Sequence, residues 1–319
     1  MSRAEAEPII RLSGVTKRFG RTVAVDDVTV DVPRGRCLGW LGPNGSGKTT
    51  LIRCMLGLAR ASAGTIHVRG REVPKDVRHA LSGVGAIVEE PRFYPYLSGR
   101  RNLEVSAGLV GRDAFGRIDA ALARVDLTDS AGRAVKKYSL GMRQRLGVAR
   151  SLLTDPELLI LDEPSNGLDP AGMAEFRQMI RSFVEEDGRT VFISSHLLDE
   201  VEKIADDIAI VQAGVLVAHG TVAQLVAGGA ATVRVRIDDR ERARKVLGGL
   251  RFVTAVEERE PRALDVSLER VDDESSIALT RALVEAGIGV AEVVQRRETL
   301  EERFLEITGG REARGEEDA

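Results

Sequence analysis

The sequence predicts an α/β protein of two domains, and three observations lead to this prediction. First, a glycine-rich loop at residues 42–50 joins an apolar run to a segment with helical periodicity. Second, short apolar runs alternate with amphipathic segments over residues 158–220, which is typical of a parallel sheet covered by helices on both faces. Third, a separate cycle of strands and helices begins near residue 232.

Size and composition fit this organisation. The 319 residues leave room for about two domains, and 43% hydrophobic with 30% charged residues describes a soluble globular chain. Residues 1–227 carry a net charge of +2 and residues 228–319 one of −5, so we place a boundary between them. We expect domains at 1–227 and 228–308 and a disordered tail at 309–319. The overall charge of −3 does not indicate nucleic acid binding.

The two cysteines and the N-terminus exclude several classes of protein. Cys37 and Cys54 lie in apolar runs without a CxxC spacing or a nearby histidine, so we expect core positions rather than a zinc site or a disulfide. The N-terminus lacks the apolar stretch of a signal peptide, and no apolar run approaches the ~20 residues of a membrane helix. Any segment that crosses a membrane would therefore belong to another chain.

The loop LGPNGSGKTT predicts binding of the phosphates of a nucleotide. From Gly42 to Thr49 it fits G-x-x-x-x-G-K-[ST], in which the glycines let backbone N–H groups face phosphate oxygens. Lys48 would reach the outer phosphates, Thr49 would give its hydroxyl to Mg²⁺, and the following helix would point its N-terminus at the anion. The alternative is a glycine-rich turn that happens to precede a helix. The expected contacts come from Gly42, Pro43, Asn44, Gly45, Ser46, Gly47, Lys48, Thr49 and Thr50.

Polar residues follow two further apolar runs. Asp162 and Glu163 end the run LLILDEP, where open α/β sheets place their ligand chemistry. Because neighbouring side chains on a strand point oppositely, we expect different roles: Asp162 holds the magnesium and Glu163 is the general base on the attacking water. The alternative is an acidic pair that starts a loop. His196 ends the next run, where we favour a γ-phosphate sensor over a capping or core histidine. With Lys48, Glu163 and His196 form the predicted catalytic set.

Five motifs occur in order, namely LGPNGSGKTT, YSLGMRQR, LLILDEP, SNGLDP and SSH. Over about residues 8–225 they closely resemble the ATP-binding subunit of ABC transporters. The resemblance implies a P-loop NTPase fold with a parallel sheet core, an antiparallel β subdomain and a helical insertion at about 97–154. The strand and helix order after residue 232 predicts a small ferredoxin-like α+β domain. ATP and Mg²⁺ are the implied cofactors, and hydrolysis of ATP is the implied reaction.

The stretch YSLGMRQR resembles the signature motif of that family, usually Leu-Ser-Gly-Gly-Gln. Ser139 and Gly141 match, whereas Tyr138, Leu140 and Met142 depart. In the family this motif caps the nucleotide bound by the other subunit, so the complete site requires a dimer. The resemblance implies that the Ser139 hydroxyl meets the γ-phosphate. Taken alone, the stretch also fits the start of an amphipathic helix.

Three more residues take expected roles from the resemblance. Asp169 matches the loop that communicates between the paired sites. Phe19 stands where the family stacks an aromatic ring on adenine, although core packing is the alternative. Glu89 aligns with a glutamine whose oxygen touches Mg²⁺, so it offers an oxygen ligand with an added negative charge. The aromatic cluster beginning at Tyr94 fits a socket for a partner helix or ordinary packing.

Three features, namely the stretch YSLGMRQR, Glu89 and the ferredoxin-like C-terminal unit, most resemble the exporter branch that includes antibiotic-resistance and bacteriocin-immunity ATPases. We expect an ATPase that pairs with a second copy of itself and drives export through separate transmembrane permease subunits at the cytoplasmic face of a bacterial membrane. The alternative is a soluble ABC-type ATPase acting on nucleic acid or ribosomes. Such proteins usually carry two nucleotide modules or a long coiled coil, whereas this chain has one module and an acidic C-terminal part. No nucleic acid partner is expected.

Overall fold

The computed structural model describes residues 7–227, 232–260, 263–268 and 272–296. The chain forms two compact units, Met1–Val222 and Ala223–Ala319, which divide just before the boundary predicted after residue 227. The predicted tail at 309–319 lies outside the described residues. Within those residues, no helix is both long enough and apolar enough to cross a membrane.

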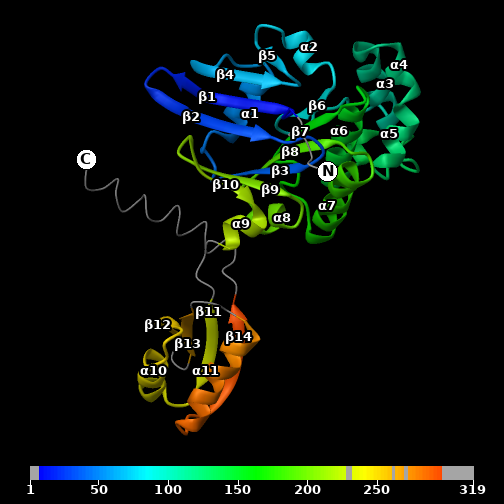
Figure 1. The fold of residues 1–319 in the computed structure, drawn as a ribbon. Coiled ribbons are helices and arrows are strands. Elements are labelled where there is room, and N and C mark those ends of the chain that lie inside the picture. Colours follow the sequence, from blue (N-terminus) through cyan, green and yellow to red (C-terminus); the bar gives the residue numbers. More distant parts are fainter. Residues whose placement is uncertain (1–6, 228–231, 261–262, 269–271, 297–319) are drawn as a thin grey trace, which may run out of the picture. The chain divides into compact units, whose positions relative to one another are not determined.

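The first unit is built on a mixed sheet of six strands in the order β10-β9-β3-β8-β7-β6 (Figure 1). Five of them run parallel, and only β10 is antiparallel to its neighbour β9. The strands are β3 (Cys37–Leu41), β6 (Val84–Ile87), β7 (Leu158–Asp162), β8 (Thr190–Ser195), β9 (Asp207–Gln212) and β10 (Val215–Thr221). This is the predicted parallel core, and it brings the carboxyl ends of β3, β7 and β8 to one edge.

A second sheet of the first unit is antiparallel, with the order β2-β1-β4-β5. Its strands are β1 (Ile10–Phe19), β2 (Thr22–Val32), β4 (Ala63–Val68) and β5 (Arg71–Val73). The helices of this unit outside the insertion are α1 (Lys48–Met55), α2 (Val77–Leu81), α7 (Pro170–Glu185) and α8 (Leu198–Glu202). The helix α9 (Val222–Ala227) spans the division between the two units. The fold class predicted from the motifs is therefore confirmed for this unit.

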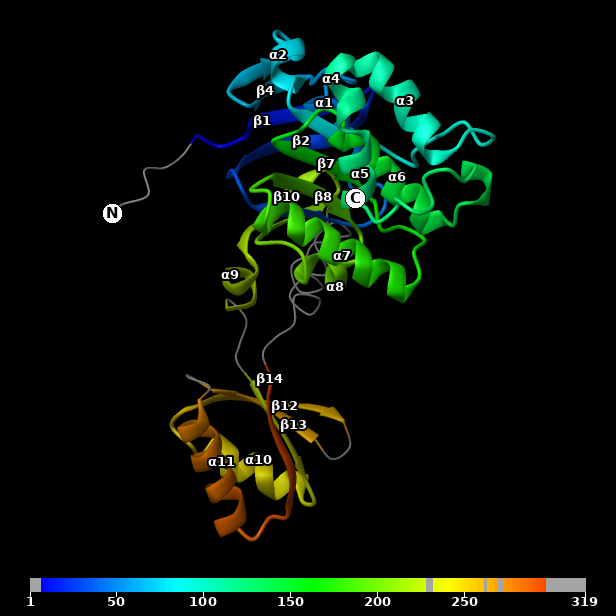
Figure 2. The same ribbon diagram turned by 90° about the vertical axis from the view of Figure 1, so that its right-hand side faces the viewer.

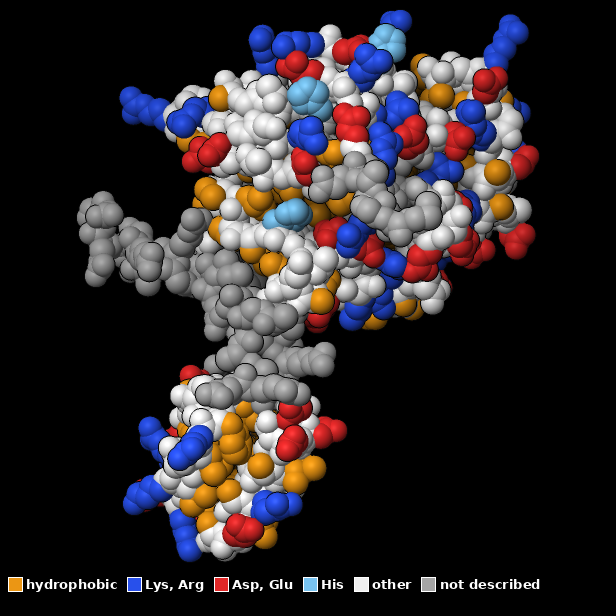
Figure 3. Space-filling model, viewed as in Figure 1, with side chains coloured by type: hydrophobic (Ala, Val, Ile, Leu, Met, Phe, Trp, Pro, Cys, Tyr) orange, Lys and Arg blue, Asp and Glu red, His pale blue; other side chains and the backbone are white. Residues whose placement is uncertain are grey.

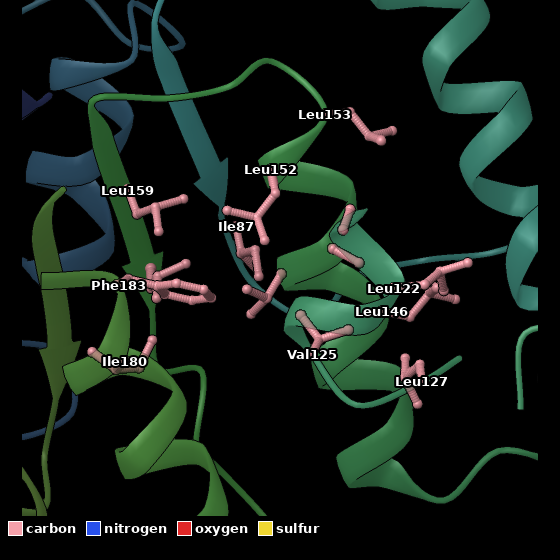
Figure 4. Close-up of a cluster of buried hydrophobic side chains, with 14 of the residues drawn as sticks. Ile87, Leu122, Val125, Leu127, Leu146, Leu152, Leu153, Leu159, Ile180 and Phe183 are labelled. Atoms are coloured by element: carbon pink, nitrogen blue, oxygen red, sulfur yellow. The ribbon is translucent and has the colours of Figure 1, made fainter. Parts of the chain in front are cut away.

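Strand alternation divides the core between the two faces of the central sheet. On β7, Leu158 and Ile160 pack with Trp40 on one face. Leu159 and Leu161 pack on the other face with Phe183 of α7. Figure 4 shows part of this second cluster, to which β6, β7, α6 (Leu140–Leu152) and α7 contribute side chains. Because β7 is buried on both faces, its polar residues are confined to its carboxyl end.

The predicted helical insertion at 97–154 contains four α-helices and one 3₁₀ turn. They are α3 (Gly99–Val110), α4 (Arg112–Gly116), α5 (Ile118–Arg124), η1 (Val135–Lys137) and α6 (Leu140–Leu152). Figures 1 and 2 show α3, α4 and α5 gathered on one side of the central sheet. Charged side chains of both signs are interspersed over the face of this unit seen in Figure 3.

The second unit has the β-α-β-β-α-β order of the predicted ferredoxin-like domain. Its elements are β11 (Thr232–Ile237), α10 (Arg240–Gly248), β12 (Val253–Glu260), β13 (Ala263–Leu268), α11 (Asp273–Glu285) and β14 (Val290–Arg296). The sheet order is β12-β13-β11-β14, and every pairing is antiparallel. A core that includes Val233, Val235 and Leu247 lies between the sheet and the helices.

Candidate functional site

The glycine-rich loop connects β3 to α1 at the edge where the parallel strands end. Gly47, the residue before α1, has a φ of 95°, a left-handed conformation that favours glycine. A Cβ atom at Gly47 would stand 2.0 Å from the carbonyl oxygen of Ala24 in β2. The loop therefore requires glycine here for both its backbone conformation and its close approach to β2.

The interior of this loop suits an anion. Ser46 is buried, and its Oγ has no hydrogen-bond partner among the described residues. The first-turn N–H groups of α1, from Lys48 onward, have no acceptor within the helix. A buried hydroxyl, free N–H groups and the positive end of the helix dipole thus converge on one loop, which is the arrangement that binds phosphate.

Lys48 is folded back into the site. Its side chain is buried, and Nζ donates to the carbonyl oxygens of Gly42 at 2.7 Å and Pro43 at 3.0 Å. The same nitrogen lies 3.2 Å from Oε1 of Glu163, although the two are not aligned as a hydrogen bond. The ammonium group therefore already lies between the loop and the acidic end of β7.

Asp162 is held from both sides by hydroxyl groups. The Thr49 hydroxyl donates to Oδ2 at 2.8 Å, and the Ser194 hydroxyl donates to Oδ1 at 2.6 Å. Asp162 is buried at the end of β7. A carboxylate and a hydroxyl oxygen side by side are hard oxygen donors, so this pair fits Mg²⁺, which takes further ligands from phosphate and water.

Glu163 stands in an unusual backbone conformation beside His196. Its φ is 46°, which is left-handed for a non-glycine residue, and its N–H donates to the Ser194 hydroxyl at 3.0 Å. Nδ1 of His196 lies 2.8 Å from Oε2 of Glu163. The predicted catalytic residues Lys48, Glu163 and His196 thus meet at one carboxylate.

Ser194 was not among the residues predicted for the site. It is fully buried in β8 and contacts both Asp162 and Glu163, so it connects the two carboxylate residues. The available signal was its place two residues before His196, in the stretch SSH at the end of an apolar strand. The apolar pattern of the strand predicts that such a serine is buried. It does not reveal which residue of the neighbouring strand its hydroxyl contacts.

Glu89 has a different partner from the Thr49–Asp162 pair. It also has a left-handed backbone, with φ at 62°, and its exposed carboxylate forms an ion pair with Arg53 of α1. Among the described residues, no hydrogen bond or ion pair joins Glu89 to Thr49 or Asp162. The structure therefore offers Glu89 a cationic partner that the sequence motif did not indicate.

Phe19 lies at the end of β1, and the residue is 55% exposed. This exposure excludes the core-packing alternative. The strand β2 returns from this hairpin to Ala24, whose carbonyl oxygen approaches Gly47 in the glycine-rich loop. The exposed ring and the loop are thus joined by a short stretch of β2.

Ser139 and Asp169 begin two neighbouring helices. The Ser139 hydroxyl accepts from the N–H of Met142 at the start of α6, and a carboxylate oxygen of Asp169 accepts from the N–H of Gly172 at the start of α7. Among the described residues, no hydrogen bond or ion pair joins either residue to the glycine-rich loop. They share a hollow of about 530 Å³, which Gly141 also lines.

Comparison with known proteins agrees with these observations. A family model described as "ABC transporter" matches residues 25–166. An uncharacterized ABC transporter ATP-binding protein of Bacillus subtilis, YdbJ, is 38% identical and aligned over 98% of this chain and 99% of its own length. The bacitracin transport ATP-binding protein BcrA of Bacillus licheniformis is 36% identical over 95% of this chain and 98% of its own length.

One solved structure similar to this chain is a dimeric post-hydrolysis state of the ATP-binding cassette MJ0796 bound to ADP and Pi. It aligns with a TM-score of 0.60 and 22% identity, over 66% of this chain and 98% of its own. At this level of identity the likeness concerns the fold alone.

Proposed function

This chain belongs to the ABC transporter family as an ATP-binding protein, and we propose that two copies of it hydrolyse ATP to power export through separate membrane subunits. The chain is an ATPase, and its nucleotide is ATP. The exported compound we propose is a small molecule or peptide of antibiotic type, because the relative BcrA is a bacitracin transport protein. We place the protein at the cytoplasmic face of a bacterial membrane, docked on its permease.

The observation that carries the reaction is the convergence of Lys48, Glu163 and His196. We propose that the buried Lys48 ammonium exchanges its carbonyl acceptors in the loop for phosphate oxygens when ATP binds. Glu163 then accepts the proton of the attacking water at its carboxylate. His196, 2.8 Å from Oε2, orients that carboxylate and lies where it can also meet the γ-phosphate.

For magnesium, we propose Thr49 and Asp162 as protein ligands. Bound Mg²⁺ would neutralise charge on the phosphate oxygens. The Ser194 hydroxyl donates a hydrogen bond to Oδ1 of Asp162, whereas Oδ2 lies beside the Thr49 hydroxyl. We propose that Oδ2 and the Thr49 hydroxyl bind the ion together. Glu89 would join this set only by leaving Arg53, so we propose that it is a conditional ligand.

For the second copy, we propose that Ser139 and Gly141 cap the nucleotide held by the partner's loop. The hollow that they line with Asp169 remains open in one chain, which supports completion of the site by dimerisation. The helix α6 has thirteen residues and presents its N-terminus beside Ser139. An N-terminus of this kind suits a terminal phosphate group.

For the permease, we propose docking near the aromatic cluster that follows Glu89. Tyr94, Tyr96 and Leu97 are 61%, 79% and 36% exposed, so ordinary core packing does not account for them. Exposed aromatic side chains are enriched in protein–protein contacts.

The decisive experiment is gel filtration of Glu163→Gln with ATP and Mg²⁺. We expect this variant to bind ATP, to lose turnover and to accumulate as a dimer. Adding Ser139→Arg should return it to a monomer that still binds ATP, because the substitution alters the proposed cap and leaves the loop of the same chain intact. A Glu163→Gln protein that is saturated with ATP and remains monomeric would contradict the proposal.

A further inference from the structure

The exposed ring of Phe19 is covered on one side by a lysine from its own strand. Nζ of Lys17 lies 4.6 Å from the centroid of the Phe19 ring, within the range of a cation–π contact. The phenylalanine residue is nevertheless 55% exposed. One face therefore carries a cation, and the remaining surface is accessible to a ligand.

A hydrogen bond to a second segment of the chain also holds the Lys17 side chain in place. Its Nζ donates to the carbonyl oxygen of Arg60 at 2.9 Å, in the segment that follows α1. Lys17 therefore ties the end of the β1–β2 hairpin to the segment that follows α1.

The hairpin also approaches the phosphate loop directly. Lys17 pairs with Val25 and Arg18 with Val23, so Ala24 lies at an irregularity opposite these residues. The carbonyl oxygen of Ala24 is the atom that a Cβ at Gly47 would strike. The strand that returns from the Phe19 hairpin therefore packs against the loop proposed to hold the phosphates.

We propose that Lys17 is a positioning residue for the nucleotide base: it holds the Phe19 ring in a fixed orientation, with the uncovered face ready to stack on adenine. This inference rests on the proposed function of Phe19. An exposed phenylalanine without a neighbour would sample several rotamers, and base binding would have to immobilise it. The cation–π contact and the bond to Arg60 restrict the ring before the nucleotide arrives, so less affinity is lost on binding.

The test compares a ligand that has a base with one that has none. Calorimetric titration with ADP reports base and phosphate contacts, whereas inorganic pyrophosphate reports phosphate contacts alone. We expect Lys17→Met to raise the Kd for ADP about two- to fivefold, the effect of one exposed cation–π contact, with the Kd for pyrophosphate unchanged. Lys17→Arg should retain ADP affinity, because a guanidinium group also stacks on aromatic rings.

The matched control is Arg18→Met, which removes the same charge from the adjacent exposed residue. It should leave both Kd values unchanged. In a Phe19→Ala background, Lys17→Met should have no further effect on ADP. Equal weakening of ADP and pyrophosphate by Lys17→Met, or no weakening of ADP, would overturn the inference.

The results separate this inference from the function on which it rests. If Phe19→Ala weakens ADP binding and Lys17→Met does not, the positioning role is wrong and the stacking role of Phe19 stands. If Phe19→Ala leaves the ADP affinity unchanged, the stacking role itself is wrong and the role of Lys17 is wrong with it. Pyrophosphate binding in each variant verifies that the phosphate loop is folded.

Discussion

Nδ1 of His196 lies 2.8 Å from Oε2 of Glu163, and the two residues come from the ends of different strands, β8 and β7. Glu163 reaches this contact with a left-handed backbone, at a φ of 46°. A conformation of this kind costs about 1–3 kcal/mol and persists where the surrounding structure enforces it. Here the N–H of Glu163 is fixed by Ser194, which directs the carboxylate toward His196.

We therefore predict that His196→Ala lowers ATP turnover by about 100-fold or more while ATP still binds, because the base loses the group that orients it. Steady-state hydrolysis and an ATP titration measure the two effects separately. The control is His79→Ala, which removes another histidine paired with a carboxylate, Asp76, in the exposed helix α2. A His196→Ala protein with the turnover of the parent would show that the contact with Glu163 is dispensable.

Ser194 should matter for both stability and hydrolysis. Ser194→Ala leaves Asp162 without the donor to Oδ1 and Glu163 without a side-chain acceptor, so we expect a loss of about 1–3 kcal/mol of unfolding free energy and a clear fall in turnover. Chemical denaturation and a hydrolysis assay provide the measurements. Ser195→Ala is the matched control, since that buried hydroxyl accepts only from the N–H of Leu197 in the described structure. Equal turnover in the two variants would argue against a positioning role for Ser194.

The ion pair of Glu89 with Arg53 gives a prediction about magnesium. Glu89→Gln should change the Mg²⁺ concentration at half-maximal hydrolysis, because it removes the negative charge of the proposed conditional ligand. Arg53→Gln should shift it in the opposite direction, since it releases the Glu89 carboxylate from its cation. Superimposable magnesium titrations of all three proteins would exclude contact between Glu89 and the metal.

Both cysteines should resist labelling in the folded protein. Burial raises the pKa of Cys37 and of Cys54, so at pH 8 the folded chain holds both as thiols, and the reactive thiolate forms mainly after unfolding. Because the pKa of each thiol is higher in the folded chain than in the unfolded chain, the two thiols also make the free energy of unfolding depend on pH. Their contribution is fully present below the pKa of an unfolded thiol, about 8.5, and declines as the pH rises above it. Ellman titration with and without denaturant measures the accessibility. Rapid reaction of a cysteine in the native protein at pH 8 would contradict its burial.

Much of the fold followed from local patterns. The run from Leu158 to Leu161 is apolar without alternation, which is typical of a strand buried on both faces. In the structure it is buried and pairs in parallel with β6 and β8. The cycle after residue 232 likewise predicted the ferredoxin-like order. These predictions succeed because periodicity and turn residues act over a few neighbouring positions.

The site was only partly predictable. Motif spacing and the ends of apolar runs identify five of its residues in the sequence, namely Lys48, Thr49, Asp162, Glu163 and His196. Three features of the site were not predicted: the contacts of Ser194, the Arg53–Glu89 pair and the position of Lys17 against the Phe19 ring. Each of these depends on which side chain faces which across two elements, and no local pattern contains that information.

The amino-acid sequence by itself determined that the chain binds nucleotide phosphates and that two adjacent carboxylates, Asp162 and Glu163, stand at the end of a buried strand. Only the tertiary structure decided how those groups are held. Parallel pairing brought Ser194 of β8 against Asp162 of β7, and the approach of β2 to the phosphate loop brought the Phe19 hairpin to the site. The physical reason is that hydrogen bonds and cation–π contacts act over a few ångströms, so they are set by packing between strands far apart in the chain.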